Sequence, residues 1–154
     1  MTGSDFGGWN ASDTFGYWFA GFVDGEGCFM IRRQKGRHST AFQLNLRDDD
    51  SDLLSSIAWH LGIGNKRPYT ERRGVDRYGY SHHSTARFYV QNKADCKMLV
   101  HILDRFHLRS KKANDYRIWR EAVLEYYRPQ PNQERLAALK VALENARKYN
   151  TGSI

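Results

Sequence analysis

The sequence has 154 residues, a length that suits one domain and leaves little room for a second. Hydrophobic residues make up 40% of the chain, which is enough for a packed core and excludes an intrinsically disordered protein. Lys and Arg outnumber Asp and Glu by 24 to 17, so the net charge is +7. This excess favours a polyanionic partner, with nucleic acid ahead of a membrane surface.

The sequence carries no signal for secretion or membrane insertion. No apolar run approaches the length of a transmembrane helix, and the N-terminus lacks a basic region followed by an apolar one. The two cysteines, Cys28 and Cys96, are too few for a disulfide scaffold and suit a reducing compartment. We therefore expect an intracellular protein with no membrane partner.

The first predicted element is an apolar helix. Ser12 or Asp13 can cap it, and it should run to about Asp24, where the sequence GEG breaks it. The segment is apolar nearly all round, so we expect it to be buried on more than one side. Gly21 and Gly25 are four residues apart, which leaves room for another backbone to approach closely.

Two hairpins follow, with a helix between them. Alternating apolar and polar residues predict strands over 28–34 and 40–47, and a second pair over 65–74 and 78–91 that turns at GVDRYG. The acidic stretch DDD leads into a helix over 51–61, because carboxylates favour a helix N-terminus. The strand residues expected to face the core are Phe29, Ile31, Phe42, Leu44, Leu46, Phe88 and Val90.

The last third of the sequence predicts three helices. They span about 94–106, 115–127 and 133–149, with the basic loop 107–112 after the first and the breaker PQPNQ before the last. The final helix has an apolar stripe at Leu136, Leu139, Val141 and Leu143. The element order α-β-β-α-β-β-α-α-α indicates an α+β protein. We expect a flexible segment over 1–11, one domain over 12–128 and a helical extension over 129–154.

The phrase FAGFVDGEG at 19–27 resembles the motif that names the LAGLIDADG family. The matching positions are Ala20, Gly21, Asp24, Gly25, Gly27 and an acid, Glu26. The element order, the segment RDDDSDLL…LGIG and the basic loop before DYRIW are also similar to the family, so the resemblance covers roughly 13–127. It implies the αββαββα LAGLIDADG fold, with a curved antiparallel sheet as its DNA-binding face and extra C-terminal helices.

The resemblance also implies a catalytic centre. The acid at the eighth motif position, Glu26, would bind Mg²⁺ or Mn²⁺ beside the scissile phosphates, since a hard cation prefers oxygen ligands. Glu stands here where the family name has Asp. Asp24, at the sixth position, would shape the end of the helix rather than bind metal.

Basic residues complete such sites in the family. The best register places Arg109 at the position of a catalytic lysine, with Lys111 as the nearest alternative. An arginine there could stabilise phosphate charge but could not act as an acid or a base. A further polar position after the second strand falls on Arg47 or Asp48. No choice between these two follows from the sequence.

The outward face of the predicted sheet forms the proposed DNA-binding surface. Its residues are of the types that reach base edges and phosphates, and almost none is acidic. They are Arg32, Gln34, Arg37, Gln43, Asn45, Arg67, Tyr69, Arg73, Arg87, Tyr89 and Gln91.

The sequence contains a single copy of the motif, so it supplies one metal-binding acid, whereas cutting both DNA strands requires two. We therefore expect a homodimer that reads a near-palindromic double-stranded DNA site and has no small-molecule substrate. The expected dimer interface is Phe19, Ala20, Gly21, Val23 and Asp24.

Two other functions use the same residues differently. A maturase that assists intron splicing, or a regulator that binds nucleic acid without cutting it, could keep this scaffold, although intact Glu26 argues against both. An RNA-binding module without nuclease ancestry would make the motif a coincidence. A zinc protein is disfavoured, because the spacings of Cys96, His101 and His107 fit no familiar zinc site.

Overall fold

The computed structural model describes residues 11–65, 69–71, 74–79 and 84–150, with the backbone alone at 69–71 and 149–150. The elements in chain order are α1 (Asp13–Glu26), β1 (Gly27–Gln34), β2 (Arg37–Arg47), the 3-10 turn η2 (Asp48–Asp50), α2 (Ser51–Leu61), β3 (Tyr69–Glu71), β4 (Thr85–Val90), α3 (Lys93–Arg105), α4 (Lys112–Tyr127) and α5 (Gln133–Asn150). Within these ranges no helix is both long enough and apolar enough to cross a membrane.

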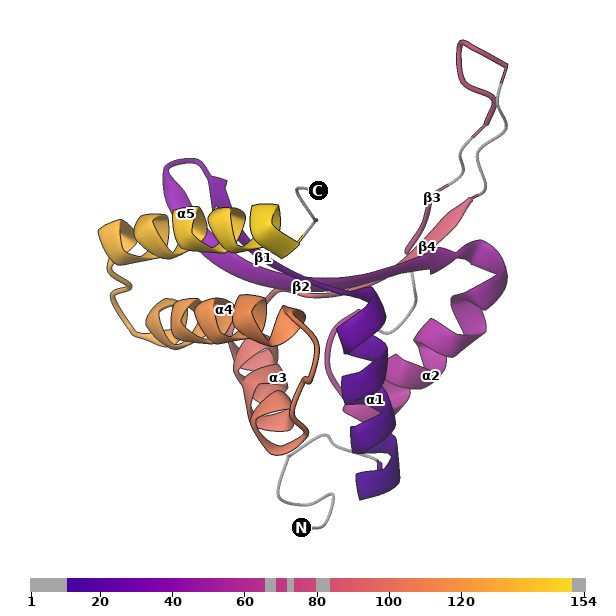
Figure 1. The fold of residues 1–154 in the computed structure, drawn as a ribbon, viewed down its shortest axis with the longest axis horizontal. Coiled ribbons are helices and arrows are strands. Elements are labelled where there is room, and N and C mark those ends of the chain that lie inside the picture. Colours follow the sequence, from indigo (N-terminus) through magenta and orange to yellow (C-terminus); the bar gives the residue numbers. More distant parts are fainter. Residues whose placement is uncertain (1–10, 66–68, 72–73, 80–83, 151–154) are drawn as a thin grey trace.

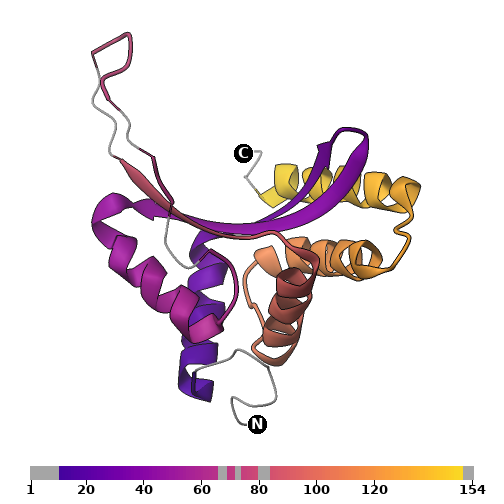
Figure 2. The same cartoon turned by 180° about the vertical axis from the view of Figure 1, so that it is seen from behind.

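The four strands form one antiparallel sheet in the order β1-β2-β4-β3. Figures 1 and 2 show that this sheet is curved, with α1, α2, α3 and α4 all beneath one face of it. The opposite face is concave and carries no helix across its middle. The predicted α+β class and the curved antiparallel sheet are therefore confirmed.

The core lies between the sheet and the helices beneath it. Phe29 and Phe42 are fully buried there and lie 5.2 Å apart, measured between ring centroids. Trp119 of α4 packs on Phe29, and its indole N–H donates to the carbonyl oxygens of Met30 and Ala41 at 3.1 and 3.0 Å. The strand residues predicted to face inward are all buried except Leu46, which is partly buried at the core's margin.

Helix α1 begins and ends at identifiable residues. The side chain of Ser12 accepts a hydrogen bond from the backbone N–H of Phe15 at 3.3 Å, so Ser12 is the N-cap. The helix ends at Glu26, two residues later than expected, because one glycine inside a helix costs only about 1 kcal/mol. The chain then enters β1 directly at Gly27, where an added Cβ would lie 2.6 Å from the Val23 side chain.

The second hairpin is described only in part. Its described strands are Tyr69–Glu71 and Thr85–Val90, shorter than the expected 65–74 and 78–91. The predicted turn is present, since the N–H of Gly79 donates to the carbonyl oxygen of Asp76 at 3.0 Å. Residues 66–68, 72–73 and 80–83 lie outside the described part of the chain.

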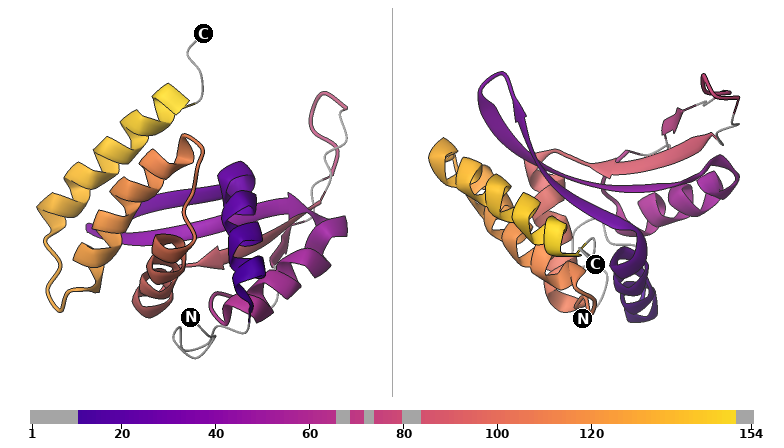
Figure 3. Two further views of the ribbon diagram at one scale, coloured as in Figure 1. Left: turned by 60° about the horizontal axis from the view of Figure 1, so that its bottom comes forward. Right: turned by 45° about the horizontal axis from the view of Figure 1, so that its top comes forward.

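Helix α5 packs along α4 and against β1 and β2 (Figure 3). Leu136 and Leu143 are buried and Leu139 packs on them, but Val141 is 56% exposed. Including Val141 in the apolar stripe was wrong. Two residues along a helix correspond to a turn of roughly 200°, so Val141 and Leu139 lie on opposite sides.

Candidate cleavage centre and nucleic-acid interface

The candidate centre starts at the last residue of α1. Glu26 is exposed at the point where the helix meets the sheet, and the chain continues into β1 without a loop (Figure 1). A rigid helix therefore fixes the backbone of Glu26 at the border of the concave face. Its carboxylate is the kind of hard oxygen ligand that a divalent cation prefers.

Asp24 connects this helix end to the loop between α3 and α4. Its carboxylate accepts hydrogen bonds from the backbone N–H groups of Arg109, at 3.0 and 3.1 Å, and of Ser110, at 2.9 Å. The Ser110 hydroxyl donates to the same carboxylate at 2.7 Å and accepts from the N–H of Lys112 at 3.2 Å. The basic loop is thus anchored two residues before Glu26.

An open pocket of about 290 Å³ lies at this junction. It is lined by Asp24, Ser110, Lys111, Lys112 and Asp115. Arg109 and Lys111 are both exposed. The structure therefore presents both candidate cations of the loop near the helix end that carries Glu26.

Arg47 lies at the other predicted catalytic position, where β2 ends. Its guanidinium is 3.7 Å from the carboxylate of Asp49, and both side chains are largely exposed. Asp48, the alternative at this position, begins η2. Exposed ion pairs of this kind contribute little to stability.

The strand register places the predicted DNA-binding residues in rows across the concave face. Gln43 is paired with Tyr89, and Asn45 is paired with Arg87. The Arg87 guanidinium donates to the Asn45 side-chain oxygen at 3.0 Å, which holds both side chains in place. Arg32, Gln34, Arg37 and Gln91 are exposed. The backbone of Tyr69 is paired with Arg87, which extends the second row to β3. Arg67 and Arg73 lie outside the described residues.

Asn65 is a supporting residue that the sequence reasoning missed. Its side-chain oxygen accepts from the N–H of Tyr89 at 2.7 Å, and its amide donates to the carbonyl oxygen of Arg87 at 3.2 Å. These bonds continue the edge of β4 beyond β3. One signal could have indicated this role. Asn65 has both a donor and an acceptor, and it comes directly after Gly62-Ile63-Gly64, where a strand was already expected.

The outer face of α1 is open. Gly21 and Gly25 are exposed, and a Cβ added at either position would meet nothing within 4 Å. Tyr17 and Trp18 are 64% and 44% exposed on the same helix. Of the residues expected at a dimer interface, only Gly21 lies on the exposed side of α1. Phe19, Ala20 and Val23 are buried in the protomer core, and Asp24 is bonded to the loop.

The described residues form no group of three or more His, Cys, Asp and Glu side chains that could hold a metal ion. Cys96 is buried, and its thiol donates to the carbonyl oxygen of Thr40 at 3.6 Å. Burial raises the pKa of this thiol to about 11, so it stays protonated at neutral pH. Cys96 therefore acts as a core residue.

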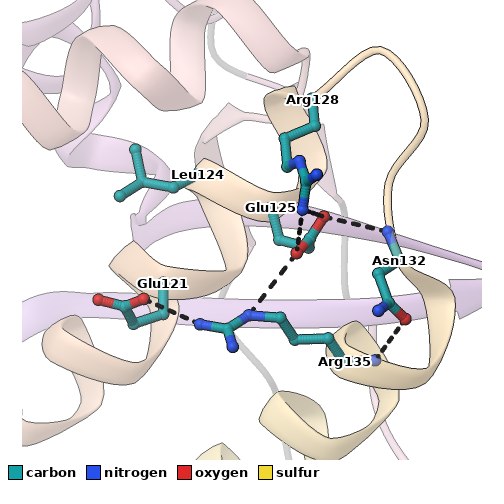
Figure 4. A pocket seen from close by; sticks show the side chains of 6 residues that line it. All are labelled: Glu121, Leu124, Glu125, Arg128, Asn132 and Arg135. Atoms are coloured by element: carbon teal, nitrogen blue, oxygen red, sulfur yellow. Dashed lines mark hydrogen bonds and ion pairs between the residues drawn. The ribbon is translucent and has the colours of Figure 1, made fainter.

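A second pocket, of about 410 Å³, lies at the turn between α4 and α5 (Figure 4). There the carboxylate of Glu125, itself only 5% exposed, accepts from the backbone N–H of Asn132 at 3.0 Å and from Arg128 at 3.3 Å. Arg135 lies 3.6 Å from Glu125 and 3.1 Å from Glu121. These charged groups pair with one another, so the cluster holds α5 against α4.

Comparison with known proteins gives consistent results. The family model described as LAGLIDADG endonuclease matches residues 19–123. The probable intron-encoded endonuclease Cox1-I1b of Schizosaccharomyces pombe is 30% identical over 116 residues, covering 72% of this chain and 27% of that protein. A protein of 50.9 kDa in ND4 intron 1 of Podospora anserina is 32% identical over 117 residues, covering 70% of this chain and 23% of that protein. The chain thus spans about a quarter of these relatives.

Solved structures show the same fold. The meganuclease I-AabMI bound to uncleaved DNA superposes with a TM-score of 0.68 at 29% identity, covering 84% of this chain and 44% of that one. The homing endonuclease I-TnaI superposes with a TM-score of 0.64, covering 87% of this chain and 96% of that one. Its identity is 18%, so this second likeness concerns the fold alone.

Proposed function

The chain belongs to the LAGLIDADG endonuclease family, and we propose that it is a site-specific homing endonuclease. Two copies would bind a near-palindromic double-stranded DNA site, and each would hydrolyse one phosphodiester with the help of Mg²⁺ or Mn²⁺. The observation that carries the proposal is the anchored junction at the end of α1. It fixes the basic loop to Asp24, two residues before the exposed Glu26, at the border of the concave sheet.

The sheet would supply affinity and sequence preference. The major groove admits a two-stranded antiparallel ribbon, and there Arg pairs with guanine and Asn or Gln pairs with adenine. Gln43, Asn45 and Arg87 lie on the concave face and belong to these residue types. The net charge of +7 would add a nonspecific attraction to phosphates.

The residues present fit a divalent cation, because Glu26 offers an exposed carboxylate oxygen at a fixed helix end. One such donor is too few, so the phosphate oxygens of the DNA, water and the second protomer would complete the site. When bound, the cation supplies charge neutralisation at the phosphate and makes the attacking water more acidic. Lys111 or Arg109 would hold a phosphate oxygen, and of the two only Lys111 could also transfer a proton.

A second copy of the chain would pack on the outer face of α1. Gly21 and Gly25 leave this face flat, so two helices can approach to backbone contact. A twofold axis through this contact would bring the two Glu26 ends together and give each DNA strand its own carboxylate. Gly21, Gly25, Tyr17 and Trp18 would then make the contact.

The test is to incubate the protein with a randomised duplex library in Mg²⁺ and, in parallel, in EDTA. The proposed function predicts discrete double-strand breaks in Mg²⁺ and intact, protein-bound duplexes in EDTA. Sequence-selective binding without cutting under either condition would favour a regulator or maturase on the same scaffold. Cutting that is equal in both conditions would contradict metal dependence.

A further inference from the structure

The C-terminal end of α5 lies against the first strand of the sheet, close to the end of α1. The guanidinium of Arg147, in the last turn of α5, is 2.6 Å from the thiol sulfur of Cys28. Cys28 is two residues after Glu26 in the chain. Figure 1 shows α5 running along β1 with its last turn directed towards the middle of the molecule. An arginine from the far end of the sequence therefore lies beside the candidate cleavage centre.

The register assigns Cys28 to the concave face. Cys28 is paired with Gln43, and Gln43 is paired with Tyr89, so the three side chains form one row across β1, β2 and β4. Directly opposed residues of antiparallel strands share a face. Arg147 therefore contacts this row at its outer end, at the edge strand β1.

The edge of a base-reading surface is where phosphates are expected. A sheet lying in a groove directs its middle to the base edges and its borders to the two sugar-phosphate walls, which receive half or more of all protein–DNA hydrogen bonds. A guanidinium has five N–H donors in a fixed geometry and binds phosphate in a bidentate manner. A thiol sulfur is a weak acceptor, so the hydrogen bond to Cys28 would compete weakly with a phosphate oxygen for the guanidinium.

We propose that Arg147 binds a phosphate of the DNA backbone beside the cleavage centre, through a position outside the segment that the family model matches, 19–123. The inference rests on the proposed function, since it requires that the concave face binds DNA. It assigns α5 a part in DNA binding as well as in packing. The phosphate it binds lies at the β1 border, close to the strand position that follows Glu26.

A purely structural role for Arg147 makes a different prediction. The C-terminus of a helix carries a partial negative charge, and the basic residues Arg147 and Lys148 in the last turn of α5 offset it. If that were the whole role, removing Arg147 would lower stability without changing the number of phosphates bound. The salt dependence of DNA binding separates the two roles, because it counts neutralised phosphates.

The experiment compares wild-type protein, R147A, R147K and K140A on a fluorescent duplex of arbitrary sequence, long enough to cover both protomers, in EDTA. Binding is titrated over a series of KCl concentrations. K140A is the matched control, because Lys140 is on the same helix, carries the same charge and pairs with Glu144 at 2.6 Å. Thermal melting is measured first, and R147Q replaces R147A if the alanine variant does not fold.

The proposal predicts that R147A loses about 0.9 of the log–log salt slope per protomer, hence about 1.8 per bound homodimer. K140A should keep the wild-type slope, and R147K should restore most of it. An R147A slope equal to that of the wild type would overturn the proposal, as would equal losses in R147A and K140A or a slope for R147K as low as that of R147A. If the wild-type protein bound no duplex at all, the proposed function itself would fail.

Discussion

The carboxylate of Asp24 binds Ser110 twice, through its backbone N–H at 2.9 Å and its hydroxyl at 2.7 Å. Asp24 is in the motif helix α1, and Ser110 lies two residues before α4, so these bonds join segments 86 residues apart. They connect the end of the helix that carries Glu26 to the loop that carries Arg109 and Lys111. The position of Glu26 relative to Arg109 and Lys111 thus depends on Asp24.

Replacing Asp24 by Asn should loosen this junction. The amide loses the negative charge and one acceptor, so donors from Arg109 and Ser110 go unpaired, and the free energy of unfolding should fall by about 1–2 kcal/mol. A displaced loop should slow single-turnover cleavage roughly 100-fold while DNA affinity changes far less. S110A is the control, because it removes the hydroxyl and keeps the backbone bond. An Asp24→Asn variant that cuts at the wild-type rate would show that the loop needs no anchor.

Replacing Gly21 by Leu should separate the protomers without unfolding them. The added side chain meets nothing within the protomer, and a leucine favours the helix by up to about 1 kcal/mol relative to glycine. Sedimentation should therefore report folded monomers for this variant, whereas the proposed assembly makes the wild type a dimer. Gly16→Leu is the contrasting control, because its side chain would meet the ring of Phe106 and should unfold the protomer. A wild-type protein that sediments as a monomer on DNA would contradict the proposed assembly.

Replacing Gln43 by Ala should relax sequence preference at one symmetric pair of target positions. Gln43 is in the middle of the row formed with Cys28 and Tyr89, where a side chain reaches base edges rather than phosphates. Losing a bidentate contact should reduce discrimination at that position by about 1–3 kcal/mol, measured by sequencing selected sites. Lys97→Ala, on α3 beneath the sheet, is the control for a substitution away from the concave face. Equal weakening on every sequence would show that Gln43 contacts the backbone alone.

Acid should destabilise the protein partly through Glu125. The backbone N–H of Asn132, together with Arg128 and Arg135, lowers the pKa of this carboxyl below its ordinary value of 4.5. A lowered pKa contributes stability above that ordinary value, and this stability is lost as the pH falls through the folded-state value. The melting temperature of the wild type should therefore drop below pH 4.5, and E125Q should lack part of that drop. E144Q, which removes an exposed partner of Lys140, should change the profile less.

The fold could be predicted well where the pattern was strong. Alternation of apolar residues identified β1 and β2, because burial on one side of a strand dictates that pattern. The acidic stretch before α2 identified its start, because carboxylates favour a helix N-terminus. The second hairpin was predicted less exactly, since Asn65, Ser84 and Gln91 fall within the expected strand ranges but lie outside β3 and β4. Few apolar residues occur between 65 and 83, so nothing in the sequence marked where pairing ends.

The site could be predicted only in part. A sequence motif identifies the types of residue at a site, but only the fold determines which residues lie next to one another. Glu26 and the basic loop followed from the resemblance to the family. The assignment of Phe19, Ala20 and Val23 to an interface did not account for the inward side of α1, because a helix that is apolar all round does not reveal which side meets its own sheet. The contact between Arg147 and Cys28 joins residues 119 apart, beyond the reach of any local pattern.

The central claim is that the Glu26 carboxylate holds the divalent cation, and the Glu26→Gln variant tests this claim most directly. Glu26→Gln keeps the shape of the side chain and loses the charge that would hold a cation. Wild-type protein, Glu26→Gln and Glu26→Asp are compared on the same selected duplex, with binding measured in EDTA and single-turnover cleavage in Mg²⁺. We predict equal binding by all three, measurable cleavage by Glu26→Asp and none by Glu26→Gln. Cleavage by Glu26→Gln at the wild-type rate would contradict the assignment of Glu26 and, with it, the proposed mechanism.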